Sequence, residues 1–211
     1  MPTIDFYFDF TSPYAYLAHC RLPGLADRHG YEIAYKPIDL KAAKLAIGND
    51  GPANMQLPVK MRYIMADIMR WVQRYKAPFN VGKGATFESE RSNIGTLYAI
   101  EKGRARDYVN ALWHASFGSG GSMGSDDLLR DVASQMGWSP DTFLEFIESD
   151  AARQRYQEVN RQAQDRGVFG VPTMMVGDQM WWGNDRIDFL DEYLAAHPAN
   201  KRADTQIEAN A

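Results

Sequence analysis

The fold is decided by residues 3–18, which read TIDFYFDFTSPYAYLA. Up to Phe10, apolar and polar side chains alternate, which is the period of a half-buried β-strand. Ser12 and Pro13 follow, and serine at the N-cap with proline in the first helical position is a favourable helix start. A helical face then runs to Gly30, and residues 31–38 alternate again. Residues 1–40 therefore predict a strand, a helix and a second strand.

The middle of the chain has helical patterns, and towards the end of the chain the patterns are again those of strands. Residues 61–75 place apolar side chains at the i, i+3, i+4, i+7 spacing of an amphipathic helix. Further helical patterns cover 91–101, 105–117, 126–136 and 140–166. Two short strands, 171–176 and 179–182, precede a final helix over 185–196.

This order, βαβ, a helical block and then ββα, resembles the thioredoxin fold with an insertion. We therefore predict an α/β fold in which a thioredoxin-like βαβ…ββα domain carries a large all-helical insertion. The expected boundaries are 1–42 and 166–200 for the discontinuous thioredoxin-like domain, 43–165 for the helical insertion domain and 201–211 for a polar tail.

Composition limits the classes of function. The chain has 211 residues, 45% of them hydrophobic and 24% charged, which is typical of a soluble globular protein of one large or two small domains. Its only cysteine, Cys20, excludes a disulfide framework and a Cys-x-x-Cys pair. A net charge of -4 disfavours nucleic-acid binding, and no apolar run approaches the length of a membrane span. With an acidic start that lacks a basic n-region, the sequence predicts a cytoplasmic protein.

The charge is distributed unevenly. Residues 36–83 contain six lysines, three arginines and three aspartates, a net charge of +6, so the rest of the chain carries -10. The simpler interpretation is a set of solvated helix faces. The alternative is a basic rim that attracts small ligands with carboxylate groups.

The start of the first helix determines which chemistry is available there. Thioredoxin-like oxidoreductases begin this helix with Cys-x-x-Cys, whereas this chain has Ser12-Pro13-Tyr14-Ala15. Thiol–disulfide exchange needs two sulfurs in turn, so we do not expect it here. A hydroxyl and unpaired N–H groups at a helix start instead favour an anion, such as the thiolate of a cofactor, and glutathione is the abundant cytoplasmic thiol. The simpler interpretation is that Ser12 only caps the helix.

The surrounding motifs resemble those of a known family. Residues 8–18 resemble the amino-terminal signature of the 2-hydroxychromene-2-carboxylate isomerases and the related kappa-class glutathione transferases. The same pattern is matched at 38–40 (IDL), 44–49 (KLAIGN), 51–54 (GPAN), 169–174 (FGVPTM) and 180–186 (MWWGNDR). The resemblance covers about residues 3–194, and the paired tryptophans together with KLAIGN are more similar to the isomerase branch.

The resemblance implies a glutathione site. Ser12 would hold the glutathione sulfur as a thiolate, and Val171 would pair its backbone with the peptide part of the cofactor. By analogy with thioredoxin-like proteins, Pro172 is expected to follow a cis peptide bond. The other implied cofactor-binding residues are Trp182, Gly183, Asn184 and Asp185.

Five further residues are implied as contacts of the cofactor or the substrate. Lys44, Asn54 and Met55 correspond to positions where the family contacts glutathione or the substrate carboxylate. Phe87 and Asn93 are also candidates, although residues 82–92 depart most from the family pattern, and the aromatic hydroxyl expected near Phe87 is missing.

Simpler structural roles are expected for the remaining candidates. We interpret Cys20 as a small buried apolar residue and the methionines between Met61 and Met69 as core. The four histidines lack metal-ligand spacing, so no metal site is predicted. Since neighbours on a strand face opposite sides, one of Trp181 and Trp182 is expected to pack inward.

The family reaction interconverts 2-hydroxychromene-2-carboxylate and trans-o-hydroxybenzylidenepyruvate in bacterial naphthalene breakdown. It proceeds by reversible thiolate addition, bond rotation and elimination, so glutathione is not consumed. The resemblance thus implies a small anionic aromatic substrate and a homodimer, whereas charge and composition predict no nucleic-acid or membrane partner. A kappa-type transferase and, more distantly, a non-catalytic thioredoxin-fold binding protein are the alternatives.

Overall fold

The computed structural model describes residues 1–199, so the predicted polar tail at 201–211 lies outside the described residues. The predicted strand–helix–strand start is confirmed: β1 (Thr3–Phe8) is followed by α1 (Pro13–His19), α2 (Leu22–His29) and β2 (Glu32–Pro37). The other elements are α3 (Leu40–Ala46), η1 (Asn54–Gln56), α4 (Pro58–Tyr75), α5 (Glu90–Glu101), α6 (Ala105–Trp113), η2 (His114–Gly118), α7 (Asp126–Gln135), α8 (Pro140–Glu148), α9 (Asp150–Asp165), β3 (Thr173–Val176), β4 (Gln179–Trp182), η3 (Asn184–Arg186) and α10 (Ile187–Ala196).

The four strands form one mixed sheet in the order β2-β1-β3-β4. β1 runs parallel to β2, with Thr3 opposite Glu32, and antiparallel to β3, with Tyr7 opposite Thr173. This is the predicted α/β arrangement, a thioredoxin-type sheet whose β2 and β3 are separated in sequence by helices α3 to α9. The exact division into two domains stays a prediction.

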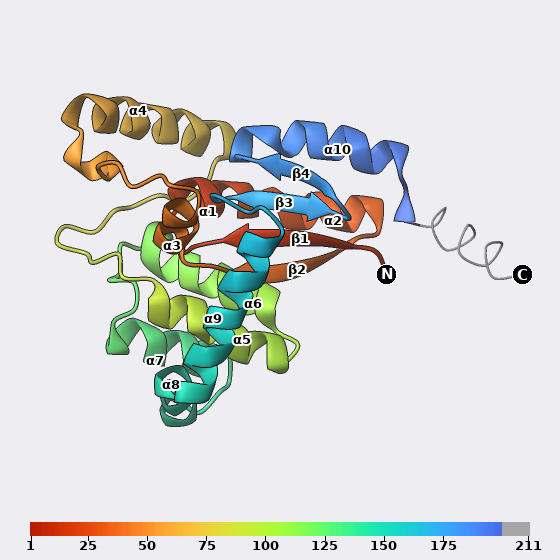
Figure 1. Ribbon diagram of the computed structural model, residues 1–211. Helices are drawn as coiled ribbons and strands as arrows, with labels where there is room; N and C mark the ends of the chain where they lie inside the picture. The colour runs from red at the N-terminus through yellow and green to blue at the C-terminus, as the bar shows by residue number, and fades with distance from the viewer. Residues whose placement is uncertain (200–211) are drawn as a thin grey trace, which may run out of the picture.

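In Figure 1, α1 and α2 are seen behind the strands, and most other helices lie to the two sides of the sheet. Figure 1 shows α4 and α10 beyond β4, and α5 to α8 beyond β2. The apolar face predicted for residues 3–10 is confirmed, because Ile4, Phe6, Phe8 and Phe10 are completely buried. Trp113 of α6 packs against Phe6, Phe8 and Phe10, and this aromatic core joins the helical block to the sheet.

Several helix boundaries differ from the prediction. The single helix expected over 140–166 is two helices, because the Ser149 side chain accepts the Ala152 N–H and starts α9 afresh. The helix expected over 105–117 changes at His114 into a π-helical turn, η2. No helix was predicted where α3 lies, and there the Asp39 side chain caps the first turn.

Two burial predictions were wrong. Met65 and Met69 are exposed and Met61 is only half-buried, because among the residues of α4 only Ile68 is buried. α4 extends past the sheet (Figure 1), so much of its apolar surface lacks a covering element within residues 1–199. Cys20 is exposed as well, since it follows the last turn of α1 at the surface. None of the helices in the described part of the chain combines the length and apolar character of a membrane span.

Candidate functional site at the start of helix α1

Ser12 lies where the chain leaves β1 and enters α1. Its backbone is extended, its Oγ accepts the Ala15 N–H at 3.2 Å, and Pro13 occupies the first helical position, as predicted. The preceding turn is held by the buried Asp9, whose carboxylate accepts the Thr11 N–H and, through its other oxygen, the Leu40 N–H, both at 3.0 Å. The position of Ser12 is therefore fixed by the first turn of α1 on one side and by the turn that follows β1 on the other.

The cis-proline segment enters the sheet at the end of the strands where β1 leaves it for Ser12. The Val171–Pro172 peptide bond is cis, as expected, and the pairing of Tyr7 with Thr173 places the end of β1 beside the start of β3. The Pro172 carbonyl accepts the Gly183 N–H at 2.9 Å. Within residues 1–199, neither the N–H nor the C=O of Val171 has a hydrogen-bond partner. Its backbone is thus free to pair with an extended ligand.

The end of β4 supplies the opposite wall. Trp182 stays about half exposed and packs edge-on to Phe169, whereas Trp181 packs inward against Tyr193, which confirms the predicted split between the two tryptophans. Gly183 has a φ of +114°, and a Cβ there would lie 2.4 Å from an Asp185 carboxylate oxygen. Only glycine accommodates this close turn into η3.

Asn184, in η3, has an unusual hydrogen-bonding state. Its side chain is 96% buried, yet its Nδ2 has no partner among the residues described. A buried amide without a partner costs free energy, so this donor is suited to an acceptor group of a ligand. The neighbouring Asp185 forms an ion pair with Arg186 at 3.0 Å.

These segments surround a pocket of about 430 Å³, within the size range of small-molecule sites. Six of the predicted residues line it: Val171, Pro172, Trp182, Gly183, Asn184 and Asp185. Ser12 is not among the lining residues; it lies two positions before Tyr14, which is. The residues that sequence reasoning missed are Tyr14, Tyr63, Asp67, Trp71 and Arg186.

α4 therefore forms one wall of the pocket. The Tyr14 hydroxyl donates to Asp67 Oδ2 at 2.9 Å, which ties α4 to the first turn of α1. Burial, together with this hydrogen bond to Asp67, raises the pKa of Tyr14 well above its usual range. Tyr14 is thus a protonated, fixed wall of the pocket and not a general base.

The five weaker candidates lie outside the pocket lining. Lys44 on α3 is half-buried and forms no ion pair with the described residues, whereas Asn54 and Met55 lie in η1 at the surface. Phe87 is partly exposed and stacks on Phe117. Asn93 is completely buried and its amide is fully used. Its Oδ1 accepts the Phe10 N–H, and the two hydrogens of its Nδ2 are shared among the Tyr156 hydroxyl, the Ile38 carbonyl and the Ser89 hydroxyl. The structure therefore does not bring Asn93 to the pocket.

Comparison with known proteins identifies the family of the chain. Residues 3–195 match the DsbA-like thioredoxin domain, so the class is a thioredoxin-domain protein, here with serine at the helix start. Among curated relatives, a 2-hydroxychromene-2-carboxylate isomerase of Pseudomonas putida is 45% identical over 90% of this chain and 93% of its own. A solved structure of 2-hydroxychromene-2-carboxylate isomerase is 42% identical, with a TM-score of 0.89 over 96% of this chain and 98% of that chain. The chain therefore belongs to the 2-hydroxychromene-2-carboxylate isomerase family.

A more distant relative connects this family to another activity. Glutathione s-transferase kappa 2 of Caenorhabditis elegans is 23% identical over 91% of each chain. Within residues 1–199, no cluster of three or more His, Cys, Asp or Glu side chains could hold a metal ion.

Proposed function

We propose that the protein is a glutathione-dependent isomerase. It interconverts 2-hydroxychromene-2-carboxylate and trans-o-hydroxybenzylidenepyruvate in aromatic catabolism of the naphthalene type. The names of the relatives at 42–45% identity support the isomerase activity. The observation that supports glutathione as the cofactor is the backbone of Val171, before the cis-proline, which has no partner within residues 1–199. This backbone lies at the same end of the strands as the Ser12 hydroxyl.

The groups around the pocket fit glutathione, a short peptide with a thiol, two carboxylates and an ammonium group. The Val171 N–H and C=O suit its peptide bonds, in the manner of strand addition. The unpaired Nδ2 of Asn184 suits a carboxylate oxygen. The Asp67 and Asp185 carboxylates, both in the pocket lining, suit the ammonium group.

When bound, glutathione supplies a thiol that adds reversibly to the conjugated double bond, so that the bond rotates before elimination restores it. The protein's part is to keep that sulfur ionised. Since a hydroxyl both donates and accepts, Ser12 can donate its O–H to the sulfur while it accepts the Ala15 N–H. The adjacent N–H of Tyr14, which has no partner among the described residues, adds positive potential at the same place.

The test is to follow the absorbance of 2-hydroxychromene-2-carboxylate with the protein, with and without glutathione. Isomerisation that requires glutathione without consuming it supports the proposal. Consumption of glutathione into a stable adduct would instead favour a kappa-type transferase, which the distant relative makes the second candidate. Failure to bind glutathione at all would favour a non-catalytic binding protein.

The protein is further proposed to be a cytoplasmic homodimer. Support for a second copy comes from apolar side chains that are strongly exposed along α4 and the segment before it: Ile47, Met55, Val59 and Tyr63. Sedimentation at several protein concentrations tests this, and a protein that stays a monomer would contradict it. A single cysteine and a glutathione cofactor fit the reducing cytoplasm, which cell fractionation can check.

A further inference from the structure

Asp9, directly after β1, is a buried carboxylate that does not line the pocket. Only 4% of its area is exposed, and no Lys, Arg or His of residues 1–199 forms an ion pair with it. Its Oδ1 accepts the N–H and the hydroxyl of Thr11, and its Oδ2 accepts the Leu40 N–H, each at 3.0 Å. Because a buried carboxylate without a cation costs free energy, its presence indicates a role for its fixed acceptors.

The hydrogen bonds of this carboxylate join two segments that each begin a helix. Its Oδ1 closes the turn before Ser12, and in the same turn the Asp9 carbonyl accepts the Ser12 N–H at 2.9 Å. Its Oδ2 holds Leu40, the first residue of α3. In Figure 1, α3 lies by the arrowhead of β1. Asp9 thus connects the turn that presents the Ser12 hydroxyl with the start of α3.

The helical block holds the next residue, Phe10, by its backbone. Asn93 of α5 accepts the Phe10 N–H, and the Trp113 indole N–H of α6 donates to the Phe10 carbonyl, each at 3.3 Å. Asn93 in turn donates to the Tyr156 hydroxyl of α9 at 2.9 Å. The turn after β1 is therefore fixed through side chains of α5, α6 and α9.

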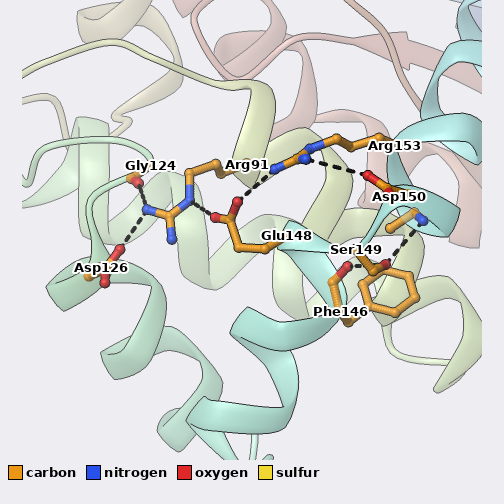
Figure 2. Close-up of polar contacts among 9 residues, drawn as sticks. Arg91, Gly124, Asp126, Phe146, Glu148, Ser149, Asp150 and Arg153 are labelled. Atoms are coloured by element: carbon orange, nitrogen blue, oxygen red, sulfur yellow. Dashed lines mark hydrogen bonds and ion pairs between the residues drawn. The ribbon is translucent and has the colours of Figure 1, made fainter.

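Ion pairs join two of these helices to one another. In Figure 2, Arg91 of α5 contacts Glu148 at 2.7 Å, and Glu148 contacts Arg153 of α9 at 2.8 Å. Arg91 lies two residues before Asn93 in the sequence. The network therefore holds together the helices whose side chains fix the turn after β1.

We propose that Asp9 is a positioning residue for the Ser12 hydroxyl, acting through its Thr11 hydrogen bonds on one side and its bond to α3 on the other. The proposal rests on the proposed function for the thiolate that Ser12 holds. The charge of Asp9 works against this thiolate, because a nearby negative charge disfavours ionisation of a thiol. Loss of the geometry should therefore raise the pKa of the bound thiol, whereas loss of the charge alone should lower it.

The test compares Asp9→Ala with Asp9→Asn in complex with glutathione. Asparagine keeps an oxygen for the Thr11 hydrogen bonds but removes the charge, whereas alanine removes both. In an ultraviolet titration of the bound thiol, Asp9→Ala should raise the thiol pKa, and its glutathione-dependent kcat/KM should fall about ten- to hundredfold, as for a misplaced catalytic group. Asp9→Asn should restore the low thiol pKa and much of the activity. Thr11→Val, which removes one of these bonds, should act in the same direction as alanine but less.

The matched control is Ser149→Ala. It removes the cap of α9 in the same helical block, where the Ser149 Oγ accepts the Ala152 N–H at 3.2 Å. This variant should lower the midpoint of urea denaturation but leave the thiol pKa and kcat/KM unchanged. Amide hydrogen exchange gives a readout without glutathione: the Ala15 N–H, which donates to the Ser12 Oγ, should exchange about tenfold faster in Asp9→Ala but not in Ser149→Ala.

Two results would overturn the positioning role. One is a thiol pKa that falls equally in both Asp9 variants, which would show that only the charge matters, and the other is unchanged Ala15 exchange in Asp9→Ala. If Asp9→Ala does not fold, the same two quantities are measured in Thr11→Val, and no change in either would overturn the role. Failure of the proposed function is distinguishable, because a wild-type protein that binds no glutathione contradicts the function, while faster Ala15 exchange in Asp9→Ala still supports the positioning role.

Discussion

Replacing Ser12 by alanine separates its proposed catalytic role from its role as a helix cap. The substitution removes the acceptor of the Ala15 N–H, a hydrogen bond of 3.2 Å. Loss of an N-cap hydroxyl costs about 0.5–2 kcal/mol of stability, and Pro13 still favours the helix start. If the hydroxyl also donates to the reacting sulfur, turnover should fall by about 10²–10³, as for other lost donors to a reacting anion.

The matched control is Ser139→Ala. Ser139 also precedes a proline at a helix start, and its Oγ accepts the Thr142 N–H at 3.3 Å. It caps α8, however, and no residue of α8 lines the pocket, whereas Tyr14 in the first turn of α1 does. Urea denaturation and the glutathione-dependent kcat/KM are measured for both variants. Similar stability losses with a large activity loss only in Ser12→Ala are expected. If the two substitutions had equal effects on stability and on kcat/KM, Ser12 would act only as a helix cap.

Three further predictions concern the pocket and the core. Trp182→Ala should weaken glutathione binding, measured by calorimetry, with little loss of stability. Trp181→Ala should lower the stability, measured by denaturation, with little effect on glutathione binding. The opposite pattern would contradict the placement of Trp182 at the pocket and of Trp181 in the core. Burial, then the charge of Arg106, lowers the pKa of His19 to about 3, so the unfolded chain binds a proton below pH 6.5 that the folded chain does not. The part of the stability that depends on neutral His19 is therefore fully present above pH 6.5 and is lost as the pH falls towards 3, so His19→Gln should show a flatter pH profile in urea denaturation. Gly95→Ala should destabilise by about 1–3 kcal/mol, since its Cβ would lie 2.3 Å from the Tyr108 hydroxyl; an unchanged melting temperature would refute this packing.

Much of the fold could be predicted from sequence because local patterns agree with the final packing. The alternation of apolar and polar side chains in residues 3–10 predicted β1 and its buried face, and the pair Ser12-Pro13 predicted the start of α1. The break at Ser149 was missed because the apolar pattern continues through it, and only the capping serine marks the new helix. The periodicity of α4 correctly predicted a helix but not its burial, which depends on what lies beside it in three dimensions.

The site was partly predictable for a similar reason. The residues around the cis-proline and the end of β4 are recognisable from short motifs, and six of them line one pocket. The wall from α4, with Asp67 and Trp71, has no sequence motif and joins the site through a tertiary contact between Tyr14 and Asp67, 53 residues apart. A helical wall of this kind becomes visible only in the folded chain.

The central claim is that the Ser12 end of α1 holds the sulfur of glutathione as a thiolate. The most direct measurement is a pH titration of the thiolate's ultraviolet absorbance for glutathione bound to the wild-type protein and to Ser12→Ala. In the wild-type complex, the thiol pKa should lie well below the value of about 8.5 for an unperturbed thiol, and in Ser12→Ala it should return towards that value. A bound thiol that titrates like free glutathione in the wild-type protein would contradict the claim.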